Sequence, residues 1–163
     1  MEKSETLKSD ITEGPFHEDI IYRRFFKAGI ITALSAGALW GAFLLVSIAV
    51  KRSFTSISIH DINAHGHAQV MGWVGLFIMG FAYQAFPRFK QGIDVRTLGG
   101  LWAPFILVNV GCTLRVSSQI LTDFTPFGFR AIGFSGFMEV TGIALWASHI
   151  WRTMKAPKIS SSY

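Results

Sequence analysis

The chain has 163 residues, of which 50% are hydrophobic and only 15% are charged, whereas a soluble domain has roughly 25% charged residues. The formal net charge is +5, but the basic residues flank apolar runs and form no stripe with interleaved aromatic residues, which argues against nucleic acid as a partner. Cys112 is the only cysteine, so no disulfide can form within this sequence. This composition predicts a protein that lies in the lipid bilayer.

The first segment, residues 1–27, is polar and contains several acidic side chains. It precedes an apolar run that is too long for the hydrophobic region of a signal peptide. We therefore expect residues 1–27 to form a cytoplasmic leader, with a short amphipathic piece around Ile20 to Phe26.

Four apolar stretches follow, and each is close to the roughly 20 residues that a helix needs to cross the hydrocarbon core. They cover residues 28–50, 64–86, 98–121 and 129–151. Because the connections between them are short, adjacent helices should be antiparallel neighbours. The sequence thus predicts an all-α, integral membrane four-helix up-down bundle over residues 28–151, followed by a cytoplasmic tail over 152–163.

The distribution of Lys and Arg near the span ends predicts the orientation of the bundle. One side receives nine basic residues, namely Arg23, Arg24, Lys27, Arg88, Lys90, Arg96, Arg152, Lys155 and Lys158. The other side receives three, namely Lys51, Arg52 and Arg130. Basic residues are enriched in cytoplasmic loops, so we expect both termini in the cytoplasm. The host membrane is expected to be a bacterial or archaeal cytoplasmic membrane.

The first span carries Gly29, Ala33, Gly37 and Gly41 at a spacing of four residues. Small residues at this spacing let two helix backbones approach closely. Packing against a neighbouring helix of the same chain is one interpretation. A homodimer seam or a contact with a partner membrane subunit is the other, and the sequence does not choose between them.

Three histidines lie within eight residues at the start of the second span: His60, His65 and His67. Interfacial histidines can simply bind water and lipid headgroups, but imidazole is also the commonest metal ligand, so this cluster is a candidate metal or haem site. Residues two apart on a helix differ by roughly 200°, so His65 and His67 should point in different directions. The face of His65 carries two glycines and favours His65 as the ligand, whereas the face of His67 is typical of ordinary packing.

Two ionisable residues are predicted inside later spans, in the same outward half of the membrane as the histidines. They are Arg115 in the third span and Glu139 in the fourth. Such residues are costly in lipid and usually pair with one another, so a structural Arg115–Glu139 ion pair is one expectation. Alternatively, Arg115 could bind a haem propionate or another anion, and Glu139 could belong to a proton path or bind a quinone hydroxyl.

Residues 65–88 read HGHAQVMGWVGLFIMGFAYQAFPR. This stretch resembles the second transmembrane helix of the haem-copper oxidase superfamily, which includes cytochrome c oxidase subunit I, and the histidine-containing helices of the NnrS family of membrane haem proteins. The resemblance implies that a histidine at the outward end of this helix is an axial ligand of a low-spin haem b. The run His-Ala-Gln-Val-Met matches one oxidase pattern and favours His67, while other subfamilies match better from His65.

The resemblance covers only residues 65–88, and the chain has far fewer spans than an oxidase subunit I. The second axial ligand of the family lies on a later helix that has no counterpart here. A haem would therefore take its second ligand from Met138 of the fourth span, from a second protomer or from a partner subunit. The resemblance implies a subunit or homo-oligomer for electron transfer in a respiratory chain, and not oxygen reduction by this chain alone.

Two other functions stay open. The chain could be a non-catalytic accessory or assembly subunit of a respiratory or nitrogen-oxide complex. It could also handle copper, because imidazole and thioether ligands near the outward surface suit Cu(I). The sequence shows no nucleophile–base spacing, phosphate loop or paired-carboxylate motif, so it gives no support to hydrolase or transferase chemistry.

Overall fold

The computed structural model describes residues 20–89 and 100–155, and every regular element in these two ranges is a helix. The chain begins with α2 (Ile20–Thr32), a π-helical segment η2 (Ala33–Leu39) and α3 (Trp40–Lys51). After a short 3-10 turn, η3 (Phe54–Ser56), come α4 (Ile59–His67), a second π-helical segment η4 (Ala68–Gly75) and α5 (Leu76–Phe89). The last two helices are α6 (Trp102–Leu121) and α7 (Phe127–Lys155).

These elements form four helices that are long and apolar enough to cross a membrane: Ile21–Lys51, Ile59–Phe89, Trp102–Leu121 and Gly128–Lys155. The predicted number of spans and the all-α class are therefore confirmed for the described residues. Residues 1–19, 90–99 and 156–163 lie outside them. These cover most of the predicted leader, most of the connection after the second span with the first two residues of the predicted third span, and the end of the tail.

The first, second and fourth helices extend beyond the predicted apolar spans. The first begins at Ile20 and the fourth ends at Lys155, several residues into the polar flanks. The second begins at Ile59, five residues before the predicted start, because the Ser58 side chain caps it and accepts a hydrogen bond from the His60 amide at 3.2 Å. Such a cap satisfies an otherwise unpaired donor at the helix start.

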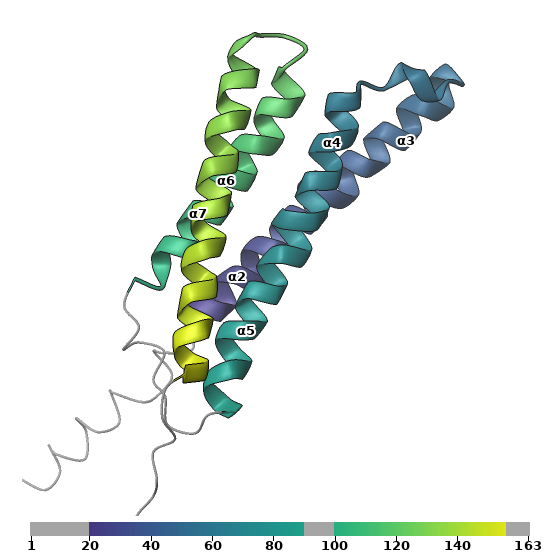
Figure 1. Cartoon of the computed structure of the whole chain (residues 1–163). Coiled ribbons are helices and arrows are strands. Elements are labelled where there is room, and N and C mark those ends of the chain that lie inside the picture. The colour runs from purple at the N-terminus through teal and green to yellow at the C-terminus, as the bar shows by residue number, and fades with distance from the viewer. Residues whose placement is uncertain (1–19, 90–99, 156–163) are drawn as a thin grey trace, which may run out of the picture.

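The helices are arranged as two antiparallel pairs (Figure 1). Helices α6 and α7 lie side by side, and the first span packs along the second. The main core is where α2, α5, α6 and α7 meet, and its buried members are Ile21, Phe25, Leu76, Met79, Ala82, Tyr83, Val108 and Ile150. A second, smaller cluster joins α4, η4 and α6 through Ala64, Ala68, Cys112 and Val116.

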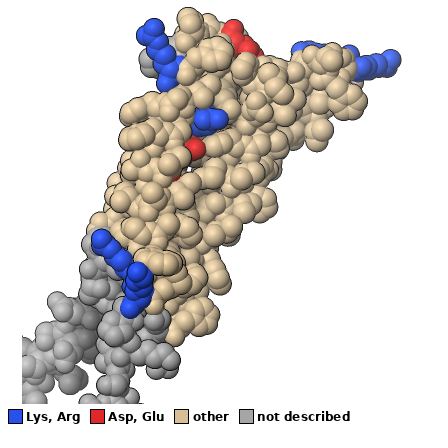
Figure 2. Space-filling view, in the orientation of Figure 1, with Lys and Arg blue, Asp and Glu red and all other residues tan. Residues whose placement is uncertain are grey.

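The outer surface of this bundle is apolar. Only 11% of the first span's most apolar window is buried, and large side chains such as Leu39, Leu45 and Val50 are exposed. In Figure 2 most charged side chains lie toward the two ends of the face shown, and the surface between them is uncharged except where a basic and an acidic side chain are visible close together. An apolar surface of this extent is stable in lipid but not in water, so the chain is an integral membrane protein.

The glycine ladder of the first span packs against the second span of the same chain. A Cβ added at Gly29 would lie 2.6 Å from the Phe77 ring, and one at Gly41 would lie 2.8 Å from the His65 ring. Gly37 faces the Gln69 side chain in the same way. The intrachain interpretation is confirmed for these three glycines, because their open sides are already filled.

Replacing Gly142 by valine should destabilise the pairing of α6 with α7. A Cβ at this position would lie 2.7 Å from a Val108 methyl group and 3.2 Å from the Val108 backbone nitrogen. Overpacking of this kind costs about 1–3 kcal/mol. Thermal unfolding in detergent, followed by circular dichroism, would measure the loss. The matched control is Gly133→Ala on the same helix, where an added Cβ meets nothing within 4 Å; an equal loss in both variants would contradict the packing.

Candidate functional site

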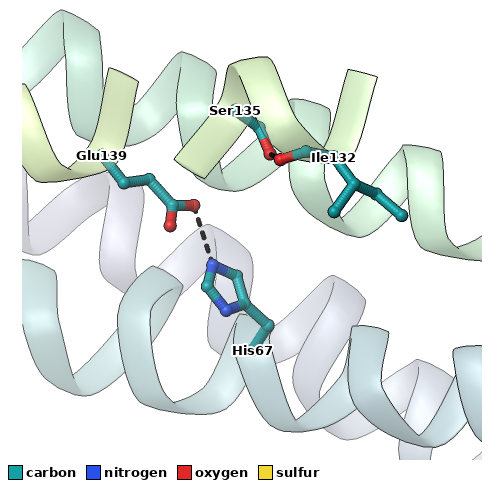
Figure 3. Close-up of polar contacts among 4 residues, drawn as sticks. All are labelled: His67, Ile132, Ser135 and Glu139. Atoms are coloured by element: carbon teal, nitrogen blue, oxygen red, sulfur yellow. Dashed lines mark hydrogen bonds and ion pairs between the residues drawn. The ribbon is translucent and has the colours of Figure 1, made fainter. Parts of the chain in front are cut away.

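The clearest polar contact inside the bundle joins His67 to Glu139. His67 Nε2 lies 2.7 Å from Glu139 Oε1, and the exposed fractions of the two side chains are 20% and 8%. Figure 3 shows the two side chains pointing at each other from facing helices, while the nearby Ser135 hydroxyl donates to the Ile132 carbonyl instead. A carboxylate inside a membrane protein needs such a partner, so this contact explains how Glu139 is tolerated.

The local sequence makes room for this contact. Gly111 on α6 lies against Glu139, and a Cβ added there would be 2.8 Å from Glu139 Cγ. His67 is the last residue of α4, and the π-helical segment η4 starts directly after it. A π-helical segment widens the helix by one residue per turn, and such segments are frequent at functional sites.

A third side chain completes a compact group. The ligand-type atoms of His67, Cys112 and Glu139 all lie within 4.8 Å of one another, and both Cys112 and Glu139 are buried. The three residues come from α4, α6 and α7. The sequence singled out His67 and Glu139 but treated Cys112 only as one thiol inside an apolar run. The signal that could have found it is depth, because Cys112 lies one helical turn from Arg115 in the same span.

Arg115 does not pair with Glu139, so the predicted structural ion pair is wrong: among the described residues the Glu139 carboxyl group pairs with His67 instead, with 2.7 Å between Oε1 and Nε2. The Arg115 Nε is buried and has no hydrogen-bond partner in the described part of the chain. The guanidinium borders an open groove of about 540 Å³ between α4 and α6. The groove is lined by Ile62, Asn63, Gly66, His67, Val70, Arg115 and Gln119.

His65 lies in a different environment. Its Nδ1 is 3.3 Å from the Ala36 carbonyl oxygen, and its ring packs on Gly41 of the first span. Gly72 is one of the two glycines on the face of His65, which leave room for either a flat macrocycle or a close helix; in the structure the close helix is present, because a Cβ added at Gly72 would lie 2.4 Å from the Thr32 side chain of the first span. The two histidines do point in different directions, as predicted. Their environments are the reverse of those expected, since His65 is packed and His67 belongs to the polar group.

The remaining candidates lie apart from the polar group. The His60 ring makes an edge contact with Phe129, with 6.0 Å between the ring centroids. Met138, half-buried on α7, belongs neither to the residues lining the groove nor to the group around His67. Within the described ranges, the structure therefore brings His67, Cys112 and Glu139 together in one group. Arg115 is not part of this group, but it lines the same groove as His67.

Replacing His65 by alanine should cost stability without disturbing this group. The change removes the hydrogen bond to Ala36 and the ring packed on Gly41, which together contribute about 1–3 kcal/mol. Thermal unfolding of the purified variant would show the loss, while any metal or haem retained by the protein should stay at its original amount. Loss of that cofactor in a variant that remains folded would instead make His65 a ligand.

The fold and the site define the class of this protein: an integral membrane helical bundle in which three helices bring together a half-buried imidazole, a buried thiol and a buried carboxyl group. Comparison with known proteins finds no matching family model, no matching curated protein and no matching solved structure. The function is therefore argued from the chemistry of the site.

Proposed function

We propose that the chain is a membrane electron-transfer protein that holds a redox metal cofactor on His67, as a subunit of a larger complex or as a homo-oligomer. The observation that supports this most strongly is the position of His67. Its imidazole lies in a polar group inside an apolar bundle and also borders an open groove that Arg115 lines, whose Nε is buried and has no hydrogen-bond partner among the described residues. Imidazole in such a setting is a characteristic metal ligand.

Haem b is the cofactor implied by the resemblance of residues 65–88, and two observations support it. His67 and Arg115 line the same groove, and the unpartnered Arg115 Nε is a suitable donor for a propionate. Bound haem would supply a one-electron redox couple. His67 Nε2 now contacts Glu139, so ligation through this atom requires that contact to open. No second histidine or methionine lines the groove among the described residues, so a second axial ligand would come from another protomer or a partner subunit.

Copper is the second candidate, and a different observation favours it. The group around His67 contains the thiol of Cys112, and thiolate with imidazole suits copper better than hard cations. Copper on these residues and haem on His67 exclude each other, because one imidazole nitrogen cannot serve both.

The orientation belongs to the same proposal. The excess of basic residues in the first turns of α2 and in the last turn of α7 supports a cytoplasmic location for both termini. His67 and Glu139 then lie in the outward half of the bundle, where an electron partner at the outer surface could approach. An epitope tag at either terminus should be protected from protease in intact cells and cleaved in inverted vesicles; cleavage in intact cells would reverse the orientation.

An optical spectrum and a metal analysis of the purified full-length chain test the function together. We expect either a Soret band that shifts on reduction with dithionite, or about one equivalent of bound copper. The non-catalytic accessory role remains the alternative, and it predicts neither. A chain that carries no haem and no redox metal, both alone and after expression with its membrane partners, would contradict electron transfer.

A further inference from the structure

The group around His67 has the composition and geometry of a small metal site. It offers one imidazole nitrogen, one thiol sulfur and one carboxylate oxygen, all within 4.8 Å of one another. Ligand atoms that share a metal ion lie a few ångströms apart, since each is bonded at about 2.0–2.3 Å. The three atoms therefore need only small side-chain movements to converge on one ion.

The surrounding backbone is built to hold these side chains close. Because Gly111 has no side chain, Glu139 can pack directly against α6; a Cβ added at Gly111 would lie only 2.8 Å from Glu139 Cγ. Gly72 does the same for Cys112, whose Sγ lies 3.1 Å from the position of a Cβ at Gly72. Ala64 and Ala68, on either side of His67 in the sequence, are fully buried in the cluster that contains Cys112. Larger residues at these positions would separate the helices that carry the ligands.

The location of the group favours a metal over a purely structural role for all three members. The His67–Glu139 hydrogen bond alone would satisfy the buried carboxylate, and it does not need a thiol beside it. Cys112 is the only cysteine of the chain, and it lies at the one place in the described helices where an imidazole and a carboxylate meet. Thiolate and imidazole together select copper or zinc over magnesium and calcium.

We infer that His67, Cys112 and Glu139 are the protein ligands of a single copper ion between α4, α6 and α7. The inference rests on the proposed function, in which a redox metal is held on His67, and it names that metal and its ligands. It also removes haem from this imidazole. Cu(II) would take one electron from a reduced electron carrier of the membrane and become Cu(I). Cu(I) would then pass that electron to an oxidised carrier and return to Cu(II).

Cobalt(II) titration of the purified, chelator-treated chain tests the ligand set. We expect one equivalent to bind with a thiolate-to-cobalt charge-transfer band in the near ultraviolet. The near-isosteric change Cys112→Ser should remove this band while circular dichroism shows an intact helical bundle. The matched control is His65→Ala, which should keep the band and the stoichiometry.

Competition with a copper(I) chelator tests whether the site binds copper and how much each ligand contributes to the affinity. Removing a group that only supports a ligand lowers metal affinity by about 10–100-fold, so losing a direct ligand in Cys112→Ser or Glu139→Gln should lower copper(I) affinity by at least about 100-fold. His65→Ala should stay within about twofold of the original affinity, because His65 lies outside the group.

The outcomes separate the two proposals. A Soret band that depends on His67 but is unchanged in Cys112→Ser would overturn the copper site and leave electron transfer standing. Binding of cobalt without a thiolate band, or retention of zinc alone by the purified protein, would also overturn it. A chain with neither haem nor bound metal would overturn both the copper site and the proposed function.

Discussion

Replacing His67 by alanine is expected to leave the purified chain without its metal cofactor. His67 is the one residue that both candidate cofactors need, because it lines the groove beside Arg115 and belongs to the group with Cys112. Loss of a direct ligand should lower the affinity by at least about 100-fold, beyond the loss caused by removing an outer partner. The measurement is the amount of haem and of copper per chain, in the original protein and in the variant.

The matched control for this experiment is His65→Ala. His65 is two residues away on the same helix, but its ring is packed on Gly41 and its Nδ1 contacts the Ala36 carbonyl. It should therefore retain the full amount of cofactor. If His67→Ala keeps the cofactor and His65→Ala loses it, the assignment of the ligand is reversed.

Replacing His67 by alanine should also lower the free energy of unfolding of the metal-free protein. His67→Ala leaves the buried Glu139 carboxyl group without its hydrogen-bond partner, and leaving a buried polar group unpaired in this way costs about 1–3 kcal/mol. Changing Glu139 to leucine in the same protein removes the unpaired polar group. The double variant should therefore be more stable than His67→Ala alone, with a coupling energy of about 0.5–3 kcal/mol between the two positions.

A double-mutant cycle measures this coupling by unfolding in detergent with a chelator present. The control cycle combines Glu139→Leu with His60→Ala, since His60 packs on Phe129 and not on Glu139. Those two changes should add within about 0.3–0.5 kcal/mol. Additivity in the His67 cycle as well would mean that the 2.7 Å contact has no energetic role.

Much of the fold follows from the sequence because a membrane helix is set by length and hydropathy. The four apolar runs each correspond to one helix, and the short connections place neighbours antiparallel. The helix ends could not be predicted from hydropathy, because hydropathy marks where a helix leaves the hydrocarbon core of the bilayer and not where its backbone hydrogen bonds end. The cap at Ser58 and the continuation of α7 to Lys155 both lie in polar sequence.

The site could be predicted only in part. The sequence gives the depth of a residue along its span, but not the direction in which its side chain points around the helix axis. Depth placed His67, Arg115 and Glu139 in one half of the bundle. It did not show that Glu139 turns toward His67 and away from Arg115. The face assignments after His67 assumed a regular α-helix, yet η4 is π-helical from Ala68 to Gly75, which shifts the side chains around the axis.

Cys112 is the member of the group that was not predicted from the sequence. A thiol in an apolar run packs like any small apolar residue, so its depth beside Arg115 is all that separates it from a packing residue in the sequence. Its proposed role as a ligand depends on the fold, because α4 and α7 bring His67 and Glu139 against the same stretch of α6. The glycine before it, Gly111, is the one local sign that another helix approaches closely there.

X-ray absorption at the edge of the metal retained by the purified full-length chain tests the central claim, a redox metal held on His67, most directly. The copper site predicts one sulfur neighbour together with nitrogen and oxygen neighbours at shorter distances. The sulfur contribution should disappear in Cys112→Ser, and the whole signal should disappear in His67→Ala. A retained metal whose surroundings are identical in the original protein and in His67→Ala would contradict the claim.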